Sequence, residues 1–259
     1  MCRPAPSGSS LRREGSLSIG PHDRRLSSGY HGGVGPDRWL GRLLAGDRLL
    51  WRVLLSLALV GLAFVFDRLA CGALRTLTLY DHLGEVREGL VAAKFLGSGL
   101  GAVVVGGVVW ALDRRHWRRA GVLWLAVALA GLGTNLVKAA TGRERPSHDD
   151  QPLGEERYAF HGPGRGLGQA PFQSFPSGHT TGAFAVATCL AAYYPPARWV
   201  AYAVAAAAGV NRVVEHEHFL SDVVAGALVG HLVAAWLLAL APVRRTWQAG
   251  SVDSGRPPP

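Results

Sequence analysis

Charged residues are scarce in this chain of 259 residues, at 17% of the sequence, whereas hydrophobic residues make up 49%. Together with a mean hydropathy of +0.16, this shortage of charge favours an integral membrane protein. Cysteine is also scarce, and Cys2, Cys71 and Cys189 stand far apart. Their spacing fits neither a metal-binding cluster nor a disulfide framework, so the sequence gives no sign of either.

Acidic residues are fewer than basic ones, which leaves a net charge of +9 and a pI of about 10.2. Such an excess can indicate a nucleic-acid partner. Here, however, the basic residues flank apolar runs and do not alternate with aromatic residues on a polar face. This distribution is typical of charges that set membrane topology, so no nucleic-acid partner is expected.

Large apolar residues are few in residues 1–37, which are rich in Ser, Gly, Pro and Arg. This composition predicts a disordered tail, because it cannot bury enough apolar surface to offset the entropy of ordering. Residues 244–259 are similarly polar and proline-rich. The division predicted from composition is therefore two disordered tails around one membrane domain, residues 38–243.

Apolar runs long enough to suggest membrane helices recur through that domain, and they predict an all-α polytopic protein with six transmembrane helices. The six segments are 49–66, 95–112, 120–137, 180–194, 199–210 and 223–243. A spanning helix needs about 20 residues, so the fourth and fifth are short and require flanking residues. They are rich in alanine, which suits helices packed inside a bundle. A soluble protein with six buried helices is the alternative, and so many apolar runs disfavour it.

The distribution of basic residues orients the predicted helices. If the N-terminus is inside, seventeen Lys and Arg, counting Arg52 near the start of the first segment, and six acids fall on the cytoplasmic side, against ten and twelve on the other side. The positive-inside rule then places both termini in the cytoplasm. The ends of the third and fifth segments and the starts of the fourth and sixth open on the extracytoplasmic side. We expect this orientation in a bacterial inner or cell membrane.

Polar residues suited to phosphate gather at those four ends. The chain places there Lys138 and Arg145, then Ser177, Gly178 and His179, then Arg212, His218 and Asp222. The planar guanidinium of arginine can hold two phosphate oxygens at once, and lysine adds a point charge. A serine and a glycine just before a helix offer a hydroxyl and unhindered N–H groups where the helix dipole favours an anion.

The two histidines of this set suit covalent chemistry. His218 and Asp222 are four residues apart, so on a helix they would share a face. The carboxylate could then hold one ring nitrogen and leave the other for nucleophilic attack. His179 could protonate the leaving oxygen. The cations Lys138, Arg145 and Arg212 would supply the positive charge that the transition state needs, so no metal and no cofactor is expected.

Simpler interpretations exist for individual residues. Lys138 and Arg212 alone would be read as interfacial anchors, and Ser177 and Asp222 as helix caps. A zinc site of the form H-E-x-x-H would need a second histidine at position 220, where the chain has Leu220. Glu215, His216, Glu217 and His218 are also consecutive, so a helix would spread them around its circumference. The metal interpretation is therefore set aside.

The motifs K-x6-RP, PSGH and R-x5-H-x3-D occur in this order, at Lys138–Pro146, Pro176–His179 and Arg212–Asp222. This combination resembles the type 2 phosphatidic acid phosphatase (PAP2) superfamily, over most of the chain. The resemblance implies that His218 is the nucleophile and forms a phosphohistidine, that Asp222 is its partner and that His179 is the general acid. It also implies that Lys138, Arg145, Ser177, Gly178 and Arg212 bind phosphate. The chain departs from the family at Asn211, where serine is usual, and at Glu144, where proline is common; Glu144 can pair locally with Arg143.

The function that follows is metal-independent hydrolysis of phosphate from a membrane lipid phosphate or diphosphate. Candidate substrates are phosphatidic acid, phosphatidylglycerol phosphate, an isoprenyl diphosphate and a lipid A phosphate, and the segment HFLSDVVAG favours the last weakly. The alternatives are a phosphotransferase using another lipid or sugar hydroxyl, and a non-catalytic membrane scaffold. The expected partners are the lipid substrate and the bilayer, and the sequence leaves the oligomeric state open.

Overall fold

The computed structural model describes residues 36–76, 84–146, 159–240 and 243, and these are mostly helical. The predicted tails, 1–37 and 244–259, lie outside the described residues except for positions 36 and 37, which open the first helix. The chain divides into two compact units, residues 1–47 and 48–259. The helices are α1 (Pro36–Thr76), α3 (Gly84–Leu96), α4 (Gly99–Leu112), α5 (Arg118–Thr141), α6 (Pro163–Gly166), α7 (Gly178–Tyr193), α8 (Arg198–Val214) and α9 (Leu220–Ala239).

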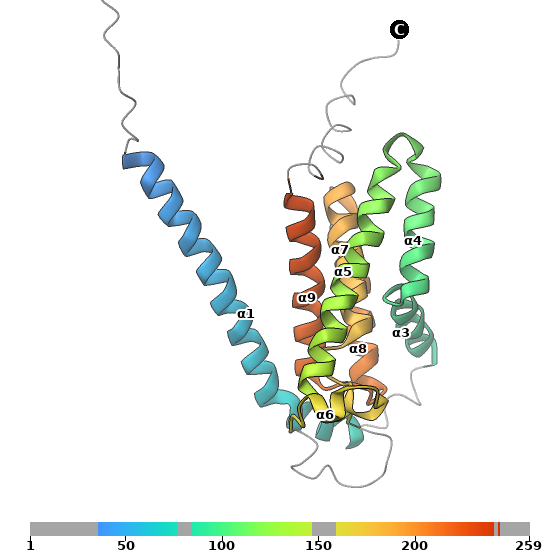
Figure 1. Cartoon of the computed structure of the whole chain (residues 1–259). Coiled ribbons are helices and arrows are strands. Elements are labelled where there is room, and N and C mark those ends of the chain that lie inside the picture. Colours follow the sequence, from blue (N-terminus) through green and yellow to red (C-terminus); the bar gives the residue numbers. More distant parts are fainter. Residues whose placement is uncertain (1–35, 77–83, 147–158, 241–242, 244–259) are drawn as a thin grey trace, which may run out of the picture. The chain divides into compact units, whose positions relative to one another are not determined.

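Helix α7 is the centre of the second unit, because it packs against α5, α8 and α9 and also touches α3 and α4. Figure 1 shows α5, α7 and α9 running side by side. Most of the residues that α7 buries are small, among them Thr180, Thr181, Ala183 and Ala185. Small side chains allow helix backbones to approach closely, which is the usual packing mode where lipid removes the hydrophobic drive between helices.

Three described helical segments are long and apolar enough to cross a membrane: Val53–Ala73 within α1, Arg118–Thr141 and Leu220–Ala239. The bent pair of α3 and α4 would raise the number to four if it counts as one span. Helices α7 and α8 have 16 and 17 residues, at or below the lower limit for a span. The protein is thus an integral membrane protein, and the number of six spans stays a prediction.

The continuous helix predicted over 95–112 is wrong, because the chain breaks at Gly97–Ser98 and the axes of α3 and α4 differ by 77°. Ser98 is the N-cap of α4 and accepts a hydrogen bond from the N–H of Gly101 at 3.0 Å. A Cβ on Gly97 would lie 2.3 Å from the carbonyl oxygen of His179. The break therefore brings backbone against backbone, and sharp kinks are common at Gly/Ser pairs.

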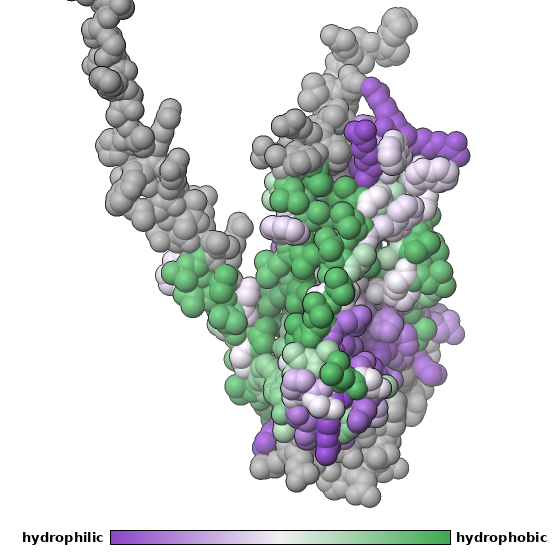
Figure 2. Space-filling view, in the orientation of Figure 1, coloured by the Kyte–Doolittle hydropathy of each residue, from purple (hydrophilic) through white to green (hydrophobic). Residues whose placement is uncertain are grey.

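The surface of the second unit separates into zones of different polarity. Figure 2 shows hydrophobic side chains over the middle of the helices and hydrophilic ones gathered towards their ends. Exposed large apolar side chains include Leu57 and Val65 of α1, Leu132 of α5 and Trp236 of α9. So much exposed apolar surface is expected where lipid replaces water as the solvent.

Close packing between α7 and α9 gives a testable consequence for stability. A Cβ on Gly230 of α9 would lie 2.2 Å from the carbonyl oxygen of Thr181. We expect Gly230→Ala to lower the free energy of unfolding by about 1–3 kcal/mol, because the two backbones would have to separate. The measurement is the midpoint of thermal unfolding of the purified protein in detergent.

Gly133→Ala on α5 is the matched control, since a Cβ there would meet no heavy atom within 4 Å. The control should unfold at or slightly above the parent's temperature, because alanine favours a helix by about 1 kcal/mol over glycine. A Gly230→Ala variant that unfolds no earlier than the control would contradict the packing argument.

Candidate active site

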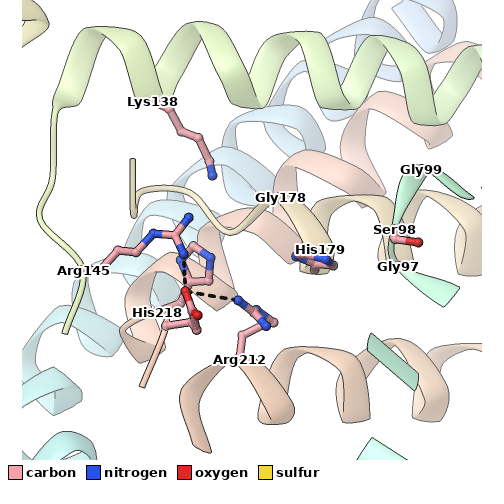
Figure 3. A pocket seen from close by; sticks show the side chains of 10 residues that line it. Gly97, Ser98, Gly99, Lys138, Arg145, Gly178, His179, Arg212 and His218 are labelled. Carbon is pink, nitrogen blue, oxygen red and sulfur yellow. Dashed lines mark hydrogen bonds and ion pairs between the residues drawn. The ribbon is translucent and has the colours of Figure 1, made fainter. Parts of the chain in front are cut away.

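One pocket of about 340 Å³ lies where the ends of α5 and α8, the start of α7 and the loop before α9 meet the break between α3 and α4. The residues that line it are Gly97, Ser98, Gly99, Lys138, Arg145, Gly178, His179, Arg212, Glu217 and His218 (Figure 3). Six of the eight residues predicted from the motifs are in this lining. The other two, Ser177 and Asp222, are fully buried.

Three cations reach the pocket from three different segments. Lys138 lies in the last turn of α5, Arg145 lies in the loop that follows, and Arg212 lies in the last turn of α8. The ammonium of Lys138 faces the start of α7, since its Nζ lies 3.9 Å from where a Cβ of Gly178 would be. Positive charge from side chains is thus concentrated beside the helix end that also favours anions.

Two glutamates partly neutralise these arginines. Arg145 donates a hydrogen bond to the carboxylate of Glu217, and Nη2 of Arg212 lies 3.5 Å from the same carboxylate (Figure 3). Arg212 also donates a hydrogen bond to Glu215 at 2.6 Å, and Glu215 accepts a second hydrogen bond from Lys94 of α3 at 2.9 Å. The guanidinium groups are therefore held in place by carboxylates at the pocket rim.

The start of α7 forms one wall of the pocket. Ser177 is the N-cap residue with an extended backbone, so the helix begins at Gly178. The first N–H groups of a helix have no partner within the helix, and Gly178 carries no side chain to cover them. Ser177 itself is behind this wall, where its N–H donates to the carbonyl of Asp222 at 2.9 Å and its Oγ accepts from Thr180.

The two predicted catalytic histidines both line the pocket. Figure 3 shows His179 towards Gly97 and Ser98, and His218 beside Arg145. His218 is 2% exposed, and its Nδ1 lies 3.6 Å from Oδ2 of Asp222 and 3.4 Å from Oγ of Ser174. Because Nδ1 faces these oxygens, Nε2 is the ring nitrogen left for a ligand in the pocket.

Burial lowers the pKa of His218 below its ordinary value. The neighbouring carboxylate of Asp222 acts in the opposite direction, and the positive charges of Lys138 and Arg145 lower the pKa further. A lowered pKa keeps the imidazole neutral near pH 7, and only the neutral ring has a lone pair on Nε2.

The prediction that His218 and Asp222 share one face of a helix is wrong. Helix α9 begins at Leu220, and Phe219 is extended, so His218 precedes the helix. The contact arises instead from the loop, which folds back so that Asp222 accepts the N–H of Phe219 at 2.9 Å. This bond from the N3 side chain to the N-cap backbone is half of a capping box, and it fixes the start of α9.

Sequence reasoning missed a second layer of residues behind the pocket. Ser174 donates to Oδ2 of Asp222 at 2.5 Å, and Arg143 donates to Oδ1 at 2.5 Å. Arg143 also binds Asp67 of α1, so the suggested local pairing of Arg143 with Glu144 is replaced by buried partners. The signal that could have found Asp67 is a carboxylate inside a long apolar segment, which is rare without a function or a partner.

His216, the neighbour of the proposed nucleophile, lies elsewhere. It is half-buried, has a φ of 52° and lines a neighbouring hollow, which shares Arg212 and Glu217 with the site pocket. The lining of the site pocket does not include it. The backbone at His216 turns the chain from α8 towards His218.

Residues 119–246 match the PAP2 superfamily. The chain is 35% identical over 121 residues to a lipid A 1-phosphatase of Rhizobium johnstonii, covering 47% of this chain and 46% of the relative. It is 35% identical over 137 residues to lipid phosphate phosphatase 1 of Arabidopsis thaliana, covering 44% and 42%. The chain thus matches less than half the length of these relatives.

Two solved structures are similar at low identity. The crystal structure of LpxE from Aquifex aeolicus has a TM-score of 0.46 and 24% identity, covering 59% of this chain and 84% of that one. The PAP2-type phosphatidylglycerolphosphate phosphatase of Bacillus subtilis has a TM-score of 0.44 and 20% identity, covering 76% and 98%. The matched residues 119–246 make up just under half of the chain and contain all eight motif residues predicted for the site, and this region belongs to the PAP2 superfamily.

Proposed function

We propose that this protein is a metal-independent phosphatase that removes phosphate from a membrane lipid phosphate or diphosphate through a phosphohistidine on His218. The observation that carries the proposal is the meeting of Lys138, Arg145 and Arg212 in one pocket with a buried histidine that is backed by a carboxylate. Such a set binds a phosphoryl group and presents a nucleophile to it.

The reaction has two steps. In the first, Nε2 of His218 attacks phosphorus, the bond from phosphorus to the lipid oxygen breaks, and His179 gives a proton to that oxygen. Asp222 stabilises the cationic phosphorylated ring. In the second, water attacks phosphorus and gives a proton to His179, the bond from nitrogen to phosphorus breaks, and inorganic phosphate leaves. Each step forms one bond to phosphorus and breaks one, and the three cations balance the charge on the phosphoryl oxygens.

The membrane setting supports a lipid as substrate. The pocket lies at the ends of helices whose flanks carry exposed apolar side chains, so a headgroup can enter while its tails stay in the bilayer. Relatives named lipid A 1-phosphatase and lipid phosphate phosphatase support the same class. The first panel for a phosphate-release assay is therefore lipid A phosphate, phosphatidic acid, phosphatidylglycerol phosphate and undecaprenyl diphosphate. If the substrate carries a labelled phosphate and the label moves to a second lipid without release of free phosphate, the protein is a phosphotransferase.

The orientation proposed from the basic residues places the site outside and both termini in the cytoplasm of a bacterial inner or cell membrane. In a version without native cysteines, Gln169→Cys should react with an impermeant thiol reagent on intact cells and Ser251→Cys should not. Gln169 is exposed, and Ser251 lies outside the described residues. Both positions should react after the cells are opened, and labelling of Ser251→Cys alone on intact cells would reverse the orientation.

A second prediction concerns cofactors. Because side-chain cations neutralise the phosphoryl oxygens, activity should survive EDTA at a concentration that strips divalent metals. Vanadate should inhibit, since it adopts a five-coordinate geometry similar to that of a phosphoryl group in transfer. The measurement is steady-state phosphate release in detergent micelles. Loss of phosphate release in EDTA that is restored by Zn²⁺ or Mg²⁺ would rule out this mechanism.

A third prediction separates the two neighbouring histidines. His218→Ala should abolish phosphohistidine formation and turnover, because the covalent step loses its nucleophile. His216→Ala, its matched control two residues away, should stay within about tenfold of the parent, or ~1.4 kcal/mol in the barrier. Asp222→Asn should fall between them, since it keeps the shape but loses the charge that supports a cationic ring.

These variants are to be compared by phosphate release and by acid-labile labelling of the protein, with folding checked by monodisperse elution. If His216→Ala is inactive and His218→Ala is active, the nucleophile must be reassigned.

A further inference from the structure

Helix α1 contributes a buried carboxylate to the rear of the candidate site. Asp67 lies within the apolar segment Val53–Ala73 and is 1% exposed. A carboxylate in such a segment is costly unless it is paired. Its partners are Nη2 of Arg143 at 2.8 Å and both the backbone N–H and the hydroxyl of Ser221, at 2.8 and 2.6 Å.

The same Arg143 joins Asp67 to Asp222. Its Nη1 donates to Oδ1 of Asp222 at 2.5 Å and to Oγ of Ser221 at 2.6 Å. Asp67, Arg143, Ser221 and Asp222 are each 1% exposed or less. They form one buried network that links α1, the loop after α5 and the first turn of α9. Charge-assisted hydrogen bonds of this kind fix the direction of the groups as well as holding them together.

This network fixes how Asp222 faces His218. Oδ1 of Asp222 is held by Arg143, and Oδ2 is held by Ser174 and by the N–H of Phe219. The carboxylate therefore has one oxygen anchored from behind and the other directed to Nδ1 of His218. A rotation of Asp222 would break the bond to Arg143, so Arg143 fixes the geometry of the pair together with Ser174 and the N–H of Phe219.

Arg143 is in turn held between α1 and the start of α9. Its guanidinium carbon lies 4.9 Å from the ring centre of Phe64 and 4.2 Å from that of Phe219. Phe64 and Asp67 are three residues apart, so they lie on one face of α1 and both contact Arg143. Asp67 also accepts the N–H of Ser221, one of the first-turn N–H groups of α9 that have no partner within that helix.

We infer that Asp67 is a positioning residue for the proposed phosphatase reaction, acting through Arg143 on the Asp222–His218 pair. It precedes the family match, which begins at residue 119, so the site extends to a helix outside the matched region. The inference rests on the proposed function. It assigns to α1 a part in the chemistry beyond anchoring the chain in the membrane.

The test compares full-length Asp67→Asn with Asp113→Asn in detergent micelles. Asp113 is a matched control, because it also pairs with a mostly buried arginine, Arg119, at 2.7 Å, between α4 and α5. We expect Asp67→Asn to lower kcat and the rate of phosphohistidine formation about 10–100-fold, as for other residues that orient a functional side chain. KM should change little, because the phosphate-binding cations stay in place. Asp113→Asn should keep the parent's kcat.

Two further variants keep the test decisive if Asp67→Asn folds poorly. Asp67→Glu restores the carboxylate and should recover part of the lost kcat. Ser221→Ala removes the hydroxyl shared by Asp67 and Arg143 and should lower kcat by less than Asp67→Asn. Thermal unfolding of each variant separates an effect on turnover from an effect on stability.

A parent that releases phosphate from none of the lipids in the panel would overturn the proposed function and this inference with it. If the parent is active and folded Asp67→Asn matches its kcat, the inference alone is overturned. If Asp67→Asn does not fold, a Ser221→Ala variant that matches the parent's kcat overturns it instead. The inference would also be overturned if Asp67→Asn only unfolds at a lower temperature, or if Asp113→Asn loses as much kcat as Asp67→Asn.

Discussion

The buried guanidinium of Arg143 is the constraint on which the rest of the site depends. A charge that is almost fully removed from water is tolerated only with charged partners and satisfied hydrogen bonds. Arg143 meets this requirement through its two terminal nitrogens, which bind Asp67 and Asp222, whereas its buried Nε has no hydrogen-bond partner among the described residues. The two carboxylates come from helices more than 70 residues away in the sequence on either side. The end of α5, the later half of α1 and the start of α9 must therefore converge before any of the three charges can be buried.

Close helix packing provides the second requirement, because the polar groups of the pocket sit on the ends of tightly packed helices. Gly226 and Gly230 of α9 lie against the backbone of Ser177 and Thr181, and Gly182 of α7 lies against Gly97. At each of these contacts a Cβ would collide with a carbonyl oxygen. The same glycines that bring the helices together thus set the distance between the start of α7, which suits an anion, and the loop that carries His218.

The sequence predicts which residues gather at the pocket better than it predicts the breaks in the helices around it. Six of the eight motif residues meet in the pocket because each stands at or beside a helix end, and apolar runs locate helices such as α5 and α9 well. The break at Gly97–Ser98 was missed because the run 95–112 is apolar throughout, and hydropathy does not register a backbone contact with His179. The partnership of Asp67 with Arg143 was missed because it joins residues 76 positions apart, and no local pattern encodes such a pair.

The balance of charge in the pocket also bears on how a phosphate would bind. Arg145 and Arg212 already share the carboxylate of Glu217, and Arg212 has Glu215 as well. An incoming phosphoryl group must compete with these carboxylates, so part of its attraction to the arginines is offset by the pairs it displaces. Lys138 approaches from α5, on the side of Gly178, where the first N–H groups of α7 lie. Phosphate binding should accordingly depend on the ammonium and the helix end as much as on the two arginines.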